Sequence, residues 1–597
     1  MKPADETMSA AGHLTPSSRI ALERVPAIVR RWGQQASVRS AFVLACLAWS
    51  LPVLAPQAFA QSETSPLRQI LSDQTTIIER FTPPPKPGTI DFTVPELRAK
   101  IPPEKGREIS FTLRSLTVQG AVTVPTSELA KVWQDKLGKT ITVADLYRIA
   151  EQIDAAYVSA GYFSLAVVPE QDFRSGQIVI TLYESYFRQV IIKSDVPGIE
   201  KRLAPYIDRV VAMRPIKIKE LERTLLLMSD LAGLTIVGTA VKPDTPSAGG
   251  DLTLTVSFKR ASASVDFDNL GSGRIGPLEL AATATLNDLF RLFETTEFVG
   301  VTVPNTPKEL VLVTGAQDFP IGIDGLHARY RLGYISSLPG GDLEPFNIRV
   351  ASTFGNIYLS YPFLRTISQN LFARIDLNFK DNDVDADFVR ETSDYNRWIS
   401  TSLRYDLTFD RGSAVITGTF GQGIAALGAN GSLDELVARP GVPLDYKFFR
   451  SSLDLTKEVF ADTTARLRVT GQYAPQALPA AVQMNLGGDP YGRAFDGMVA
   501  AGDSGVAAAF ELSHTTKLRG PVLTSLNLFA FVDYGSVWNY DVSAPYVVET
   551  LGSAGFGVRG SFGDRFSAQV LVAFPWEDTA VLSEAGTRVY FKLGAAF

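Results

Sequence analysis

The sequence has very few of the residues that build reactive or metal-binding sites. It contains 1 cysteine and 3 histidines among 597 residues. A disulfide scaffold is therefore excluded, and a cysteine-rich zinc or iron–sulfur site is nearly excluded. We expect no cofactor, no metal and no catalytic residue.

Positive charge is also in deficit. The 57 Lys and Arg residues face 63 Asp and Glu residues, which gives a formal net charge of −6. Because nucleic-acid-binding domains usually carry a basic face, we expect no nucleic acid partner. The hydrophobic fraction of 45% is too high for a largely disordered chain. Abundant Gly (47) and Phe (35) instead indicate a large β structure with many turns.

Long apolar runs are absent after residue 60, which excludes a helical membrane span there. The one notable apolar stretch, Ala41 to Leu54, follows several arginines and precedes Ala58-Phe59-Ala60. This order predicts a secretory signal peptide over residues 1–60. An N-terminal membrane anchor is the alternative, but the stretch is short and contains Pro52.

Two short segments follow the leader. Residues 61–82 can form a helix, with Leu67, Ile70 and Ile77 partly on one side. The tract 83–107 opens with several prolines, and such tracts are stiff and extended. We therefore expect a short helix on a tether, free to dock elsewhere in the molecule.

Two similar α+β units come next, over residues 108–184 and 185–258. Their first strands, near Phe111 and Phe187, are each followed by two helical patterns and two strands. The second helix of the first unit can be capped by Thr142. The first helix of that unit is expected to carry on one face Leu129, Val132, Trp133 and Leu137. The shared β-α-α-β-β order indicates an internal repeat.

Residues 259–597 show short alternating runs in place of helices. In the last run, one face carries Val589, Phe591, Leu593, Ala595 and Phe597, and the other carries Arg588, Tyr590 and Lys592. A closed transmembrane barrel satisfies both faces, with apolar residues toward lipid and a wet interior. At roughly 10 residues per strand, the region accommodates about 16 antiparallel strands. A soluble β-sandwich is the alternative, but its size would be unusual.

Two motifs suggest other chemistry. Gly502-Asp503-Ser504-Gly505 resembles the nucleophile turn of a trypsin-like protease, but a serine nucleophile needs a positioned base. Neither His327 nor His514 lies in a supporting motif. The acidic run 381–387 lacks the Gly and Glu of an EF-hand calcium loop. We interpret the first motif as a polar turn between strands and the second as a solvated extracellular loop, and we expect no enzyme activity.

The order of these parts resembles the outer-membrane transporters of two-partner secretion, the haemolysin secretion/activation (TpsB) family. The two units are similar to its polypeptide-transport-associated (POTRA) domains. The first unit matches through Gly161-Tyr162-Phe163-Ser164 and the second through Asp230-Leu231-Ala232-Gly233. Asp268-Asn269-Leu270-Gly271 matches the opening of the family's barrel. The fold implied is a transmembrane β-barrel preceded by two POTRA-like domains.

The resemblance also implies two functional motifs in the barrel. The family carries a Val/Ile-Arg-Gly-Tyr/Phe tip on a loop that folds back into the pore, matched here by Gly492-Arg493-Ala494-Phe495. Gly492 and Ala494 depart from the pattern, and Ala tolerates positive φ poorly. The second motif is intact as Phe531-Val532-Asp533-Tyr534-Gly535. By resemblance, Arg493 pairs with Asp533 on the inner wall, in a pair that can be bidentate.

Another match to the loop motif is Val558-Arg559-Gly560. It lies inside an alternating run, after the Phe-x-Asp-x-Gly motif. We therefore interpret Arg559 as an ordinary lumen residue, although the choice between Arg493 and Arg559 stays open at the level of sequence.

The function implied by the resemblance is a pore in the outer membrane, with its N-terminal domains in the periplasm. It would recognise an unfolded, exported partner (a TpsA-like exoprotein) and pass it to the cell surface. The helix near residues 65–81 would plug the resting pore. Outer-membrane lipid would surround the barrel, and Phe597 would serve as the C-terminal signal for the barrel-assembly machinery. Two alternatives remain: an insertase of the same superfamily, which generally has more periplasmic units, and a passive porin.

Overall fold

The computed structural model describes most of the chain after residue 103. The described residues are 103–241, 249–431, 436–497, 499–540, 547–580 and 585–597, together with 88–93 and Gln74, Ile77, Ile78, Arg80 and Phe81. The signal peptide expected over residues 1–60 lies outside them. Most of the expected helix 61–82 and part of the tract 83–107 do so as well.

The first α+β unit packs one long helix on a small sheet. Its elements are α4 (Pro103–Glu108), β2 (Ser110–Thr112), β3 (Ser115–Gln119), α5 (Thr126–Ala130), η1 (Gln134–Lys136), β4 (Thr140–Thr142), α6 (Val143–Ser159), β5 (Ser164–Val167), η2 (Phe173–Ser175) and β6 (Gln177–Glu184). The sheet has the order β3-β6-β5. Leu146, Ile149 and Ile153 recur at helical spacing on α6 and are fully buried in the core.

The two helices expected in this unit differ in how well the structure matches them. At the start of α6, Asp145 N donates to Thr142 Oγ1 at 3.1 Å and Thr142 N donates to the Asp145 carboxylate at 2.9 Å, so the expected cap is a full capping box. The expected first helix, with Leu129, Val132, Trp133 and Leu137 on one face, is wrong in its extent. Only the five residues of α5 are α-helical, the short 3-10 helix η1 follows, and the segment ends at Gly138, where φ is +78°. Leu129 and Trp133 are nevertheless buried, so their spacing serves the core without a continuous helix.

The second unit repeats the arrangement and gains a strand from the linker. Its elements are β7 (Tyr186–Lys193), α7 (Ile199–Ala212), α8 (Ile218–Ser229), β8 (Leu234–Val241) and β9 (Gly249–Phe258). The sheet has the order β1-β8-β9-β7, in which β1 is Ile90–Thr93. Backbone pairing of β1 with β8 is parallel, with Ile90 opposite Ile236. A linker strand at this edge is not predicted from the sequence.

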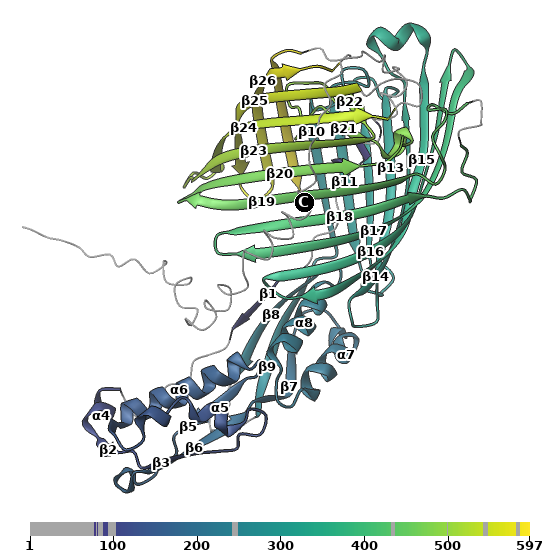
Figure 1. Cartoon of the computed structure of the whole chain (residues 1–597). Coiled ribbons are helices and arrows are strands. Elements are labelled where there is room, and N and C mark those ends of the chain that lie inside the picture. The colour runs from purple at the N-terminus through teal and green to yellow at the C-terminus, as the bar shows by residue number, and fades with distance from the viewer. Residues whose placement is uncertain are drawn as a thin grey trace, which may run out of the picture. The chain divides into compact units, whose positions relative to one another are not determined.

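Sixteen antiparallel strands close into a barrel (Figure 1). They are β10 (Ala261–Asp268), β11 (Glu279–Asn287), β12 (Thr295–Thr302), β13 (Leu310–Ile321), β14 (Leu326–Ser337), β15 (Arg349–Arg365), β16 (Gln369–Ala386), β17 (Val389–Phe409), β18 (Gly412–Gly423), β19 (Lys447–Phe460), β20 (Thr463–Tyr473), β23 (Ser504–Lys517), β24 (Leu523–Asn539), β25 (Val547–Phe562), β26 (Phe566–Asp578) and β27 (Arg588–Ala596). The ring closes where β27 pairs with β10, so the predicted fold class is confirmed. Among the described residues, no helix is long and apolar enough to cross a membrane.

The last strand shows how alternation separates the two faces of the wall. Val589, Leu593 and Phe597 are exposed on the outer face, whereas Tyr590 is only 8% exposed and points inward. Phe597 N donates to Ala263 O at 2.8 Å, and Ala263 N donates to Phe597 O at 3.2 Å. The terminal residue therefore takes part in the seam that closes the barrel.

The acidic run 381–387 is not a solvated loop, contrary to the sequence prediction. Most of it belongs to β16, where Asn382 and Val384 are buried and the acids alternate with them. Arg390 on β17 forms ion pairs with Asp383 and Asp385. Because the positive charge of Arg390 on the neighbouring strand offsets these acids, residues 381–386 can form part of a long hairpin.

Candidate functional site in the barrel lumen

The connection between β20 and β23 folds back into the barrel. It contains η4 (Ala480–Val482) and a small hairpin of β21 (Met484–Leu486) and β22 (Ala500–Gly502). Between these two strands lies the tip with the predicted motif. Arg493 is 2% exposed, and Ala494 and Phe495 are 0% exposed. The tip packs with inward side chains of β23 to β27, so it lies against the inner wall.

Arg493 contacts three carboxylates and one aromatic ring. Its Nε lies 3.4 Å from Asp533 Oδ2, and its Nη1 donates to Glu511 Oε2 at 3.3 Å. Nε also lies 3.1 Å from Asp489 Oδ1, and the guanidinium carbon lies 3.9 Å from the centre of the Phe531 ring. The pair with Asp533 has one contact and is not bidentate. The arginine is held by several weaker contacts together, because a desolvated cation gains from both carboxylates and ring faces.

Asp533 holds the tip backbone as well as the arginine. Its Oδ1 accepts a hydrogen bond from Gly492 N at 3.0 Å and another from the Ser553 hydroxyl. The Gly492 backbone has φ +114°, a conformation that L side chains rarely adopt. The left-handed residue of this tip is therefore Gly492, and Ala494 has no positive φ. Gly492 stands where the family pattern has Val or Ile, and Ala494 stands where it has Gly. Of these two positions, only that of Gly492 has a positive φ here.

The remaining motif residues provide close contacts around the tip. Phe495 O accepts a hydrogen bond from Tyr590 OH at 3.2 Å. Phe531 is buried and lies under the arginine. At Gly535 an added Cβ would lie 2.7 Å from Leu486 Cδ2. The wall and the small hairpin are therefore too close here for a residue larger than glycine.

Sequence reasoning missed Glu511, Tyr590 and Ser553 as partners of the tip. Glu511 also accepts from Arg559 Nη1 at 2.6 Å and Nη2 at 3.1 Å, and so it bridges the two candidate arginines. Arg559 lies on β25 and contacts residues of the wall. These partners come from different strands, and their contacts depend on the register of the barrel. No local motif in the sequence could have indicated them.

The described residues before the linker lie against another part of the inner wall, formed by β11 to β15. Gln74 Nε2 donates to Ser337 Oγ at 3.0 Å, and Ile77 is buried against inward residues of β11 to β15. Arg80 contacts Glu279 and Asp268, and its Nη1 donates to Leu270 O at 3.2 Å. The segment is thus held by polar groups at both of its ends and by an apolar contact between them.

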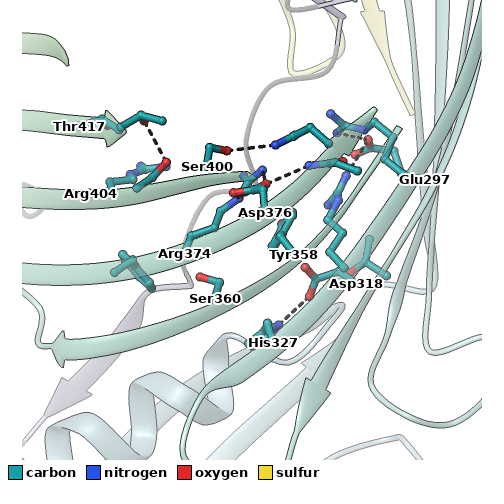
Figure 2. A pocket seen from close by; sticks show the side chains of 18 of the residues that line it. Glu297, Asp318, His327, Tyr358, Ser360, Arg374, Asp376, Ser400, Arg404 and Thr417 are labelled. Carbon is teal, nitrogen blue, oxygen red and sulfur yellow. Dashed lines mark hydrogen bonds and ion pairs between the residues drawn. The ribbon is translucent and has the colours of Figure 1, made fainter. Parts of the chain in front are cut away.

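A cavity of about 1110 Å³ lies inside the barrel beside this segment. Figure 2 shows its charged wall, with side chains from several neighbouring strands pointing into the same space. Arg329 lies 3.1 Å from Glu297, His327 Nδ1 lies 2.6 Å from Asp318, and Arg374 Nε donates to Asp376 at 2.8 Å. The wall is strongly polar, and these charged side chains form pairs of opposite sign. Such a wall suits a hydrated path that does not bind a passing charged group strongly.

The second α+β unit and the linker contact the barrel through buried and half-buried arginines. Arg365, the last residue of β15, pairs with Asp230 at 2.7 Å and also donates to Gly88 O. Gly88 N in turn donates to Asp230 Oδ1 at 2.8 Å. On α7, Arg202 forms a two-pronged pair with Asp288. Gly88 of the linker is therefore held between Asp230, in the motif Asp230-Leu231-Ala232-Gly233, and the barrel.

A closed barrel preceded by two small α+β units, with one connection folded back against its inner wall, is the architecture of an outer-membrane barrel protein. The profile of the haemolysin secretion/activation protein ShlB/FhaC/HecB family matches residues 251–560, and that of the ShlB-type POTRA domain matches residues 111–185. The chain belongs to this haemolysin secretion/activation family.

Individual relatives agree with the family. A haem/haemopexin transporter protein, HuxB of Haemophilus influenzae (strain 86-028NP), is 21% identical over 79% of this chain and 85% of that protein. The outer-membrane transporter CdiB of Escherichia coli is 21% identical over 82% of each. Its solved structure matches 90% of this chain and 100% of that chain, with a TM-score of 0.69 at 19% identity. CdiB of Acinetobacter baumannii matches the same share of each chain with a TM-score of 0.59.

These findings favour secretion over the insertase and porin alternatives. The protein is an outer-membrane transporter of two-partner secretion, with its N-terminal domains in the periplasm, and it passes a partner protein across that membrane. The family is one of secretion transporters and is not a known family of enzymes.

Proposed function

We propose that the protein captures an unfolded partner with its periplasmic units, threads it through the lumen and releases it at the cell surface. The observation that carries this proposal is the lumen itself, which holds a charged cavity and also two internal obstacles. One obstacle is the segment with Gln74 and Arg80, and the other is the tip with Arg493. A passive porin has no need of internal segments held by specific ion pairs.

Capture would use the edges of the two small sheets. An extended chain can add to such an edge through backbone hydrogen bonds, which tolerate varied sequence. In the first unit, β5 is at an edge of its sheet, and in the second β7 is. The β8 edge is occupied by the chain's own β1. A partner strand at β8 would have to replace β1, and this exchange would pull on the linker and on the residues before it.

Opening would require the segment with Gln74 to leave the lumen. Glu279 and Asp268 are buried, so water or the partner would have to replace Arg80 as the segment leaves. The tip with Arg493 and Asp533 would then guide the partner along the remaining wall. The secreted exoprotein is the partner proposed here. Outer-membrane lipid around the exposed outer face and assembly machinery that reads Phe597 would be further partners.

Conductance in planar bilayers tests the plug. The mature protein and a Gln74→Ala/Arg80→Ala variant are compared, with Lys131→Ala as the matched control, since Lys131 is exposed in the first unit. The double variant is expected to show more frequent channel openings than the wild type. Equal opening in all three proteins, with normally folded barrels, would refute a plug at this position.

A further inference from the structure

Asp503, which the sequence places in a polar turn, is a fully buried centre of contacts. Its side chain is 0% exposed. Both of its carboxylate oxygens accept from the guanidinium of Arg439, the second at 3.1 Å. Further donors are Leu478 N at 2.9 Å, Gln483 Nε2 at 3.0 Å and Tyr540 N at 2.8 Å. Every lone-pair direction of the carboxylate is thereby engaged.

The donors come from three different connections of the barrel. Arg439 belongs to the connection between β18 and β19, Leu478 and Gln483 to that between β20 and β23, and Tyr540 to that after β24. Since β10 starts directly after the periplasmic units, all three connections lie at the opposite end of the barrel. This end faces the cell exterior.

Apolar contacts also join the outer connections to one another. Ala480 packs with Leu343 and Val384, and Ala438 lies next to the same cluster. Leu478 and Val482 pack with Tyr446, at the end of the connection that carries Arg439. The outer connections therefore fold onto one another beside the buried ion pair, and a polypeptide that leaves the lumen meets them last.

We infer that Asp503 and Arg439 are the latch of an outer gate, which holds the root of the folded-back connection closed until cargo exits. The inference rests on the proposed translocation function. The tip of the same connection is held separately, through Arg493, so release of the tip alone leaves its root in place. In the open state water hydrates both partners of the latch. In the closed state each needs the other, because a single buried charge is strongly unfavourable.

The two residues are positioning residues for export, and they are separate from the barrel wall that provides stability. Arg439 lies outside the strands, so its loss removes a contact between connections and leaves the ladder of the wall intact. The gate and the fold can therefore be measured apart. A single thiol introduced into the mature protein can be labelled selectively, because the 1 native cysteine, Cys46, precedes the predicted cleavage site.

The test is a labelling experiment on the cargo-free mature protein in liposomes. Ala480→Cys places a single thiol in the cluster beside the latch, where the native side chain is 6% exposed. With Arg439→Gln added, reaction with a membrane-impermeant maleimide is expected to accelerate at least about tenfold, because the unpaired Asp503 charge favours local opening. Mean conductance in planar bilayers is expected to rise in parallel. Arg390→Gln, which removes a more exposed pair at the same end, is the matched control and should change neither quantity.

Heat-modifiable migration reports whether each variant has a folded barrel. If Arg439→Gln does not fold, Asp503→Asn takes its place, since it keeps the shape of the side chain. The inference is overturned if a folded variant labels and conducts like Ala480→Cys alone. Secretion of the partner is measured separately in cells. A wild-type protein that exports nothing would refute the proposed function, whereas the labelling of the cargo-free gate would still decide the latch.

Discussion

At the scale of single residues, the folded-back tip depends on a few buried polar contacts. Arg493 is nearly inaccessible and shares its charge among Asp533, Glu511 and Asp489. Removal of one partner of a buried pair usually costs about 3–5 kcal/mol, because it leaves the other charge unpaired. Here several carboxylates would be left together, so the position of the tip should be sensitive to this residue.

Arg493→Ala is therefore expected to reduce export of the partner severalfold at normal barrel levels. The measurement is the amount of secreted partner per folded barrel in the outer membrane. Arg466→Ala is a suitable control, because its ion pair with Asp454 is exposed and such pairs contribute little. Undiminished export by Arg493→Ala would remove this arginine from the mechanism.

The backbone of the tip gives a second prediction. Gly492→Ala forces a Cβ into a left-handed conformation, 3.1 Å from Gly487 Cα, and such strain costs about 1–3 kcal/mol. We expect faster proteolysis of the β20–β23 connection in the purified variant. Gly497→Ala is the control, since a Cβ there meets nothing within 4 Å. Equal proteolysis of the two variants would contradict the importance of the Gly492 conformation.

Residue-level prediction from the sequence succeeded for motifs and failed for their partners. The motif around Asp533 can be found because its letters are contiguous. Glu511 and Tyr590 reach the tip only through the register of the barrel, which the sequence does not display. Asp503 was interpreted as part of a polar turn, since burial of a charged turn residue depends on three connections that are distant in the chain.

At the scale of elements, alternation predicted the barrel and its last strand, and helical spacing predicted the long helix α6. Both patterns report which face of an element is buried, and both are local. Helix α5 is much shorter than the helix expected there, and the linker strand β1 was not predicted. Each is fixed by tertiary contacts, the first by the core around Leu129 and the second by the open edge of β8.

The first α+β unit offers a prediction about pH. Burial of the Glu184 carboxyl disfavours its charge, but hydrogen bonds from Thr123, Val122 and Tyr157 outweigh this effect and hold the pKa of Glu184 below its ordinary value of 4.5. A carboxyl group whose pKa is lowered by folding stabilises the folded state at pH values above its ordinary pKa. This stability is lost as the pH falls through the lowered pKa.

We therefore expect α6 of the full-length protein to lose protection as the pH drops below about 4.5. Hydrogen exchange of α6 peptides, corrected for intrinsic rates, measures this change. In Glu184→Gln the part of the change that is due to this carboxylate disappears, whereas Glu151→Gln, on the exposed side of α6, serves as the control. The same loss of protection in Glu184→Gln as in the wild type would contradict the assignment.

At the scale of the whole molecule, the barrel unites two properties that a passive pore does not need together. Its lumen is wide enough to hold a polar cavity of about 1110 Å³, yet it also holds an N-terminal segment and a folded-back connection. The second periplasmic unit is joined to it at Arg365, next to Gly88 of the linker. The order of the parts could be predicted from the sequence, whereas the contacts that close the resting pore could not.

The central claim is that a partner polypeptide passes through the inside of this barrel. Two adjacent residues of β17 test it directly, because Ser402 lines the cavity whereas Leu403 is 54% exposed on the outer face. A photo-crosslinking amino acid is placed at either position in secreting cells, and adducts are identified by mass spectrometry. The structure predicts a covalent adduct with an exported polypeptide from position 402 and none from position 403. Adducts of equal yield from both positions, or from position 403 alone, would contradict translocation through the lumen.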